Sequence, residues 1–122
     1  MDNLDATINK VGFEIVEAIK TKGKDKTKYK NYIDKVLGVL SNDGVYAYWI
    51  YCKANKIDDI FIKTVENILK VIKDIPTKDD KNNYQEYFQD LSKNLSSLLF
   101  TKELIEKALI YARYHAKAVK DE

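Results

Sequence analysis

The segment from Ser41 to Ala54 constrains the fold most, because it holds the only tryptophan, the only cysteine and the longest run without a charged residue. Side chains of this kind are normally buried, so a core has to be built against this segment. Its β-branched and aromatic residues suit either a buried strand or a buried helix. No other segment alternates with a period of two, and a lone strand would leave backbone groups unpaired. We therefore expect a buried helix over residues 43–55, with Trp49 and Cys52 in structural roles.

Apolar residues recur at helical spacing along the rest of the chain, which predicts an all-α fold. The first stripe consists of Leu4, Ile8, Val11, Ile15 and Ala18, widened by Phe13 and Val16 and weakened by Gly12. Polar stretches at 21–27 and 77–83 are expected to be exposed connections. Together the stripes predict a single helical domain over residues 1–122, a compact bundle of about six helices. The expected helices cover residues 3–21, 28–40, 43–55, 58–75, 84–98 and 101–119.

Several helix ends are marked by residues with capping chemistry. The sequence Ser41-Asn42-Asp43-Gly44 offers side chains that could cap the following helix and a glycine where the backbone needs freedom. Asp58 and Thr101 are expected to be N-caps of later helices. Phe100 is placed to pack against Ile105 as a hydrophobic staple.

Composition limits the class of protein. The chain is 45% hydrophobic and 33% charged, and it has no apolar run long enough for a membrane span. Its first residues are acidic and polar, unlike a secretory signal, and the single Cys52 cannot form an internal disulfide. A cytoplasmic protein is therefore expected.

Residues that could carry out catalysis are scarce. The only histidine, His115, is far in sequence from Cys52, so neither a metal site nor a nucleophile with a base is indicated. His115 is expected to be a partly exposed helix residue, and Cys52 a small buried hydrophobe. The four glycines are not clustered as in a phosphate loop. We expect no cofactor and no enzymatic activity.

Positive charge is unevenly distributed, although the net charge is only +2. One concentration is a run of alternating lysines, Lys20, Lys22, Lys24, Lys26, Lys28 and Lys30. The other, at helical spacing on one edge of the last helix, consists of Arg113, Lys117 and Lys120. The run could be a solvated loop or a patch that contacts phosphates, and the edge could bind phosphates or complement the helix dipole. The nine tyrosines could stack on bases, but most occupy core-facing stripe positions.

Two segments resemble a known family. Residues 32–50 combine a helix, an Asn-Asp-Gly junction and an apolar helix, and residues 100–118 form a closing helix that opens with threonine and ends in a basic, aromatic and alanine-rich run. In order and spacing these segments resemble the small α-helical subunit of the Cmr complex, the type III-B CRISPR RNA-guided effector.

The resemblance implies a non-catalytic subunit that stacks with copies of itself and with other Cmr subunits, and that helps to hold guide RNA and target RNA in antiviral defence. Carried over by position, Arg113 and Lys117 are the best candidates for contact with the RNA backbone, and Lys53 and Lys56 are weaker ones. Charge alone adds Lys120 and the lysines from Lys20 to Lys28. The alternative is a helical protein–protein adaptor that does not contact nucleic acid.

Overall fold

The structure is a computed structural model that describes residues 4–66, 68, 86, 93 and 95–119. These residues form helices and no strand, which confirms the all-α prediction. The α-helices are α1 (Leu4–Lys20), α2 (Lys26–Asp43), α3 (Val45–Ala54), α4 (Asp58–Phe61) and α7 (Leu95–Val119), and a 3-10 helix, η1, covers Gly23–Asp25. The expected continuous helix 58–75 was wrong, because α4 ends at Phe61 and residues 62–65 form turns. Residues 69–75, the polar stretch 77–83 and most of the expected helix 84–98 lie outside the described residues. The single domain stays a prediction.

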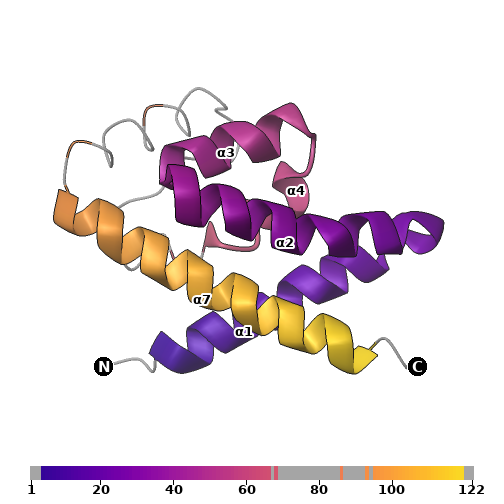
Figure 1. Cartoon of the computed structure of the whole chain (residues 1–122). Helices are drawn as coiled ribbons and strands as arrows, with labels where there is room; N and C mark the ends of the chain where they lie inside the picture. The colour runs from indigo at the N-terminus through magenta and orange to yellow at the C-terminus, as the bar shows by residue number, and fades with distance from the viewer. Residues whose placement is uncertain (1–3, 67, 69–85, 87–92, 94, 120–122) are drawn as a thin grey trace.

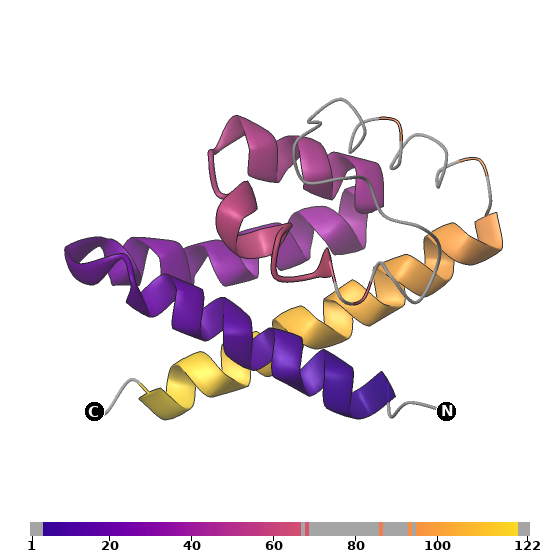
Figure 2. The ribbon, with the colours of Figure 1, turned by 180° about the vertical axis from the view of Figure 1, so that it is seen from behind.

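The two terminal helices cross each other and form one side of the molecule. Figures 1 and 2 show α1 and α7 as an X, with α2, α3 and α4 above it. The end of α1, the beginning of α2 and the end of α7 lie at the same end of the molecule, on the right of Figure 1. Basic segments that are far apart in the sequence are therefore brought to one end of the fold.

Gly12 lies where α1 and α7 pack most closely. A Cβ atom at this position would be 2.8 Å from the Cβ of Tyr111 and 2.9 Å from the carbonyl oxygen of Ala108. Only glycine leaves room for helix backbones to approach this closely. The view of Gly12 as a weak point was therefore wrong, because its missing side chain makes the helix crossing possible.

The core confirms the main stripes. Tyr48, Trp49 and Cys52 of α3 are buried, as expected for the apolar segment. The hydroxyl of Tyr48 donates a hydrogen bond to the carbonyl oxygen of Phe61, 2.5 Å away, so the buried phenol keeps a partner. Phe13 was expected inside but is 50% exposed, because it lies on the edge of α1 away from the core. Further buried hydrophobic residues are Ile8, Val11, Ile15, Val16, Ile19, Ile33, Val36, Leu40, Val45, Ile60, Leu104, Ile105, Ala108, Leu109, Ala112 and Ala116.

The junction of α2 and α3 depends on Gly44. The residue has φ +95° and ψ −178°, a conformation open essentially only to glycine. Its N–H donates to the carbonyl of Leu40, 3.1 Å away, and its carbonyl accepts from the N–H of Tyr48, 3.0 Å away. The expected side-chain caps were wrong, because Ser41, Asn42 and Asp43 continue α2 and no side chain caps α3.

The end of α3 is a Schellman motif. The N–H of Ile57 donates to the carbonyl of Cys52 at 2.9 Å, and the N–H of Lys56 donates to that of Lys53 at 3.2 Å. Lys56 adopts φ 57°, the left-handed conformation that this motif requires. Asp58 is then the first residue of α4 and not its N-cap.

Two other expected helix ends differ from the structure. Thr101 lies inside α7, where it is buried and its hydroxyl donates to the carbonyl of Ser97, 2.7 Å away. Its side chain thus bonds backward within a continuous helix instead of capping a new one. Phe100 is 44% exposed, so it does not act as the expected staple. The exposed connection at 21–27 is also shorter than expected, because η1 and the first turn of α2 occupy most of it.

Candidate nucleic-acid interface

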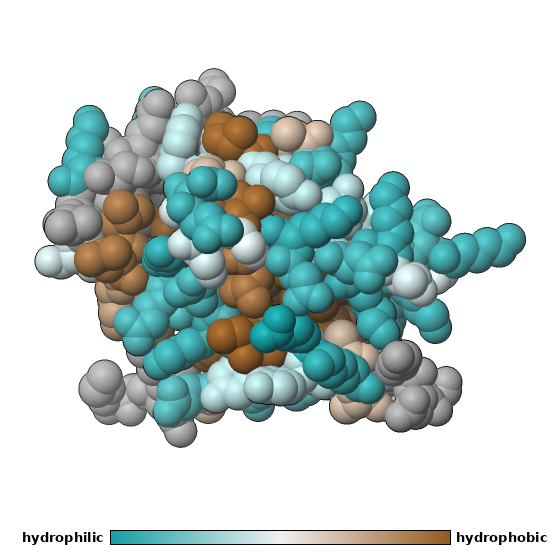
Figure 3. Space-filling model, in the orientation of Figure 1, coloured by the Kyte–Doolittle hydropathy of each residue, from teal (hydrophilic) through white to brown (hydrophobic). Residues whose placement is uncertain are grey.

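A groove of about 430 Å³ opens between α2 and α7. It lies at the end where α2 begins and α7 ends, and Figure 3 shows hydrophilic side chains gathered over this end. Ile33 and Ala116 are buried, and the other lining residues are polar or charged, although the aliphatic parts of the side chains make more of the lining surface apolar than polar. The lining consists of Thr27, Lys30, Asn31, Ile33, Asp34, Arg113, Ala116 and Lys117, and we call this surface the basic groove.

The charge of the basic groove is positive. Lys30, Arg113 and Lys117 contribute cations, against a single carboxylate from Asp34. The amino end of α2 and the carboxyl end of α7 both lie here, and their helix dipoles have opposite signs. The side chains therefore decide the sign of the local field. Thr27 adds a hydroxyl that can donate a hydrogen bond to a phosphate oxygen.

Arg113 is held in position across the groove. Its Nη1 lies 3.1 Å from Oδ1 of Asp34, and the two side chains are 41% and 66% exposed. An exposed ion pair stabilises a fold by at most about 1 kcal/mol. The guanidinium has five N–H donors, so one contact to Asp34 leaves donors for an anion in the groove.

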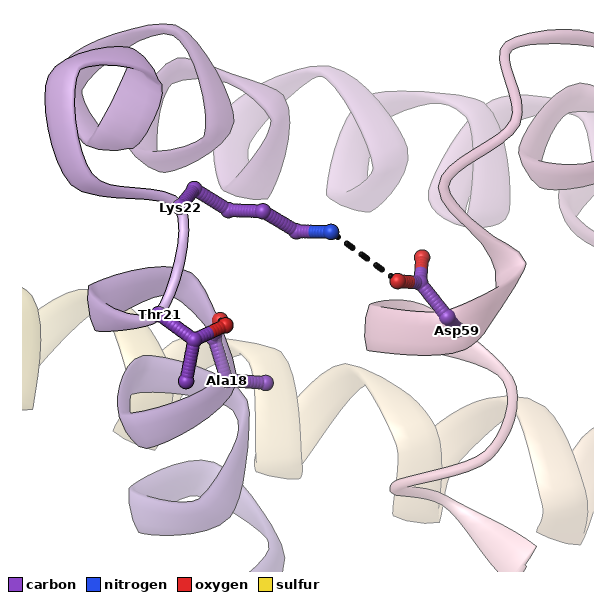
Figure 4. A network of polar contacts seen from close by, with 4 residues as sticks. All are labelled: Ala18, Thr21, Lys22 and Asp59. Atoms are coloured by element: carbon purple, nitrogen blue, oxygen red, sulfur yellow. Dashed lines mark hydrogen bonds and ion pairs between the residues drawn. The ribbon is translucent and has the colours of Figure 1, made fainter.

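The lysine run does not act as one patch. Lys20 pairs with Glu17 at 3.2 Å, and Lys22 pairs with Asp59 of α4 at 3.0 Å. Figure 4 shows the Lys22 side chain extended toward Asp59. The hydrogen bond and the charge of Asp59 raise the pKa of Lys22. Lys22 therefore links the segment before α2 to α4 and is a poor candidate for RNA contact.

The other predicted lysines are exposed but lie outside the basic groove. Lys24 belongs to η1, and Lys26 and Lys28 lie in the first turn of α2. Lys53 and Lys56 lie at the end of α3, and neither lines the groove. Lys120 lies outside the described residues. The structure thus brings together Arg113 and Lys117 but not the remaining candidates.

Sequence reasoning missed part of the basic groove. Lys30 belonged to the lysine run but not to the chosen candidates, and Thr27, Asn31 and Asp34 were not considered. Thr27, Lys30, Asn31 and Asp34 stand at positions i, i+3, i+4 and i+7, which places them in a polar stripe on one face of a helix. The stripe was obscured because α2 begins at Lys26, two residues earlier than expected.

The residues considered for catalysis lie elsewhere. Cys52 is buried in the core, and burial raises the pKa of its thiol. Nε2 of His115 lies 3.1 Å from Oδ1 of Asn9, on the side of α7 that packs against α1. Among the described residues, no group of three or more His, Cys, Asp or Glu side chains is placed to hold a metal ion. In the same part of the chain, no helix combines the length and apolarity that a membrane crossing requires.

Comparison with family models, with curated proteins and with solved structures finds no match.

Proposed function

We propose that this protein is a non-catalytic RNA-binding subunit of a type III-B CRISPR effector complex, acting in the cytoplasm in antiviral defence. In this proposal the basic groove contacts the phosphate backbone of guide or target RNA, and other faces contact neighbouring subunits and further copies of the chain. No catalytic residue and no cofactor is part of the proposal.

The observation that carries the proposal is the convergence of Lys30, Arg113 and Lys117 on one open groove. Lys30 and Arg113 are far apart in the sequence, so a solubilising role would not require that they meet. Cations aligned along a groove suit a polyanion, because each phosphate contact releases condensed counterions. The resemblance of residues 100–118 to the closing helix of the Cmr small subunit also supports RNA contact by the edge of α7 that carries Arg113 and Lys117.

One observation favours the adaptor alternative. Arg113 is already paired with Asp34 at 3.1 Å, and such a pair could serve only to join α2 to α7. The two functions differ in their response to salt, since phosphate contacts weaken steeply as salt rises. A charge reversal in the groove therefore separates them.

The test uses the purified chain with a fluorescently labelled single-stranded RNA, measured by anisotropy at several salt concentrations. The double variant Arg113→Glu with Lys117→Glu should weaken binding by about tenfold or more. It should also reduce the slope of log K against log salt by about 1.4, since each phosphate contact on a single strand contributes about 0.7. An unchanged affinity and slope would contradict RNA contact in the groove.

A matched control is Lys63→Glu with Lys102→Glu, which makes the same change in net charge. Neither residue lines the basic groove. If this control weakens binding as much as the groove variant does, only net charge matters and the groove assignment is wrong. Thermal melts of both variants exclude a loss of folding as the cause.

A further inference from the structure

An exposed aromatic surface lies beside the basic groove and is used neither by the core nor by the groove. Phe13 is 50% exposed, Tyr111 is 38% exposed and Tyr114 is 61% exposed. Together with His115 they come from α1 and α7 at the helix crossing, and we call these four residues the aromatic patch. Single exposed apolar side chains are normal on a protein surface, whereas four neighbouring rings are not explained by that background.

Local contacts hold the aromatic patch together. The rings of Phe13 and His115 pack edge to face, with centroids 5.7 Å apart and an interplanar angle of 83°. Nε2 of His115 also lies 3.1 Å from Oδ1 of Asn9. The close approach of α7 at Gly12 brings the Cβ of Tyr111 next to the residue that precedes Phe13. The crossing of α1 and α7 therefore holds the rings of Phe13 and His115 against each other and places Tyr111 beside them.

The aromatic patch adjoins the basic groove on the surface of α7. Successive residues of a helix turn by about 100°, so Tyr114 lies on the solvent-facing arc between Arg113 and Lys117 on one side and Tyr111 and His115 on the other. Cations and exposed rings thus occupy neighbouring strips of one helix. This is the composition of surfaces that bind single strands, where cations follow the phosphates and rings stack on bases.

We propose that the aromatic patch stacks on unpaired bases of single-stranded RNA whose phosphates lie in the basic groove. This inference rests on the proposed function and makes it more specific, because a duplex would keep its bases away from the rings. A second copy of the chain is a less suitable occupant. A symmetric contact over this part of α7 would place the cations of both copies near each other, which is unfavourable.

The test compares three labelled RNAs of equal length: a single strand, the same strand with abasic sites at its centre, and a duplex. Tyr114→Ala should weaken binding of the intact single strand by about fivefold or more, which is the lower end of the range for one stacked base. Binding of the abasic strand and the duplex should stay within about twofold of wild type. Tyr114→Phe keeps the ring and should restore single-strand binding. The salt slope should not change, because no phosphate contact is lost.

The outcomes separate this inference from the proposed function. If the groove variant weakens binding while Tyr114→Ala binds all three RNAs like wild type, phosphate contact in the basic groove is supported and base stacking by the aromatic patch is refuted. If the wild-type chain shows no salt-dependent binding to any RNA, both proposals fail. If Tyr114→Ala instead shifts the sedimentation coefficient from a dimer to a monomer with unchanged RNA affinity, the aromatic patch is a self-association surface and the inference is overturned.

Discussion

The packing of α1 on α7 can be tested with a pair of glycine-to-alanine substitutions, Gly12→Ala in α1 and Gly38→Ala in α2. In a helix interior this change normally stabilises by about 1 kcal/mol, because alanine has the higher helix propensity. At Gly38 no atom lies within 4 Å of the new Cβ, so the full gain is expected. Gly38→Ala is therefore the control that measures propensity alone.

At Gly12 the same methyl group meets another helix. The new Cβ would lie 2.8 Å from the Cβ of Tyr111, 2.9 Å from the carbonyl oxygen of Ala108 and 3.0 Å from the backbone nitrogen of Ala112. Favourable carbon contacts lie at about 3.5–4.0 Å, and two of these neighbours are backbone atoms that cannot rotate away. Overpacking of this kind costs about 1–3 kcal/mol, which outweighs the gain in propensity. After the gain in propensity is subtracted, we expect Gly12→Ala to lower the free energy of unfolding by up to about 2 kcal/mol.

The gain in propensity is common to both variants, so they should differ by the overpacking cost alone, about 1–3 kcal/mol, with Gly12→Ala the less stable. Urea unfolding followed by far-ultraviolet circular dichroism measures this difference directly. For a chain of this size it corresponds to a separation of roughly 10 °C in Tm. Equal stabilisation by both variants would refute a close crossing of α1 and α7 at Gly12.

Four further predictions address individual contacts. Gly44→Ala should destabilise by about 1–3 kcal/mol in urea unfolding, because a Cβ is strained at φ +95°; a neutral effect would mean that the junction has another conformation. Lys56→Gly should stabilise by about 1 kcal/mol in the same assay, since it relieves a left-handed lysine. Asp34→Asn should raise RNA affinity a few-fold in anisotropy, because it removes the one carboxylate in the basic groove, whereas the adaptor function predicts no change. Burial raises the pKa values of Cys52 and Tyr48, so both groups bind protons more tightly in the folded chain. Their contribution to the free energy of unfolding is complete below about pH 8 and is lost as the pH rises further. Cys52→Ala should therefore make the fall of stability at alkaline pH less steep.

The sequence was sufficient for the all-α class, for the approximate places of α1, α2 and α3 and for most of the core, because these follow from the spacing of apolar residues within one segment. It was not sufficient for the early end of α4 or for the continuity of α7 through Thr101. The stripe positions Ile8, Val11 and Ile15 are buried as expected, and placing them required no knowledge of the partner helix. Phe13 and Gly12 were misjudged because their environment depends on the partner helix, which the spacing within one segment does not show. Whether a ring at the edge of a stripe is covered, and whether a glycine is a weakness or a contact, depends on how near the other helix lies.

The candidate site was predictable only in part. Arg113 and Lys117 were found from their spacing on one helix and from the family resemblance. The remaining partners required the packing of α2 on α7, which no local pattern specifies. Lys22 shows the opposite error, because its local context indicated a free cation and the fold pairs it with Asp59, 37 residues away.

On α7, the residues proposed to contact RNA lie on a different face from the residues that form the core. Three of its alanines, Ala108, Ala112 and Ala116, are buried and allow neighbouring helices to pack closely. Arg113 and Tyr114 belong to the solvent-facing arc of the same helix and are not part of the buried core. A substitution on the alanine face should therefore lower RNA binding only in proportion to the unfolded fraction, whereas a substitution on the solvent-facing arc should lower it in a fully folded chain. Measuring Tm and affinity on the same variants distinguishes these two causes, and a variant of the solvent-facing arc that loses both would show that binding and folding are not separable on this helix.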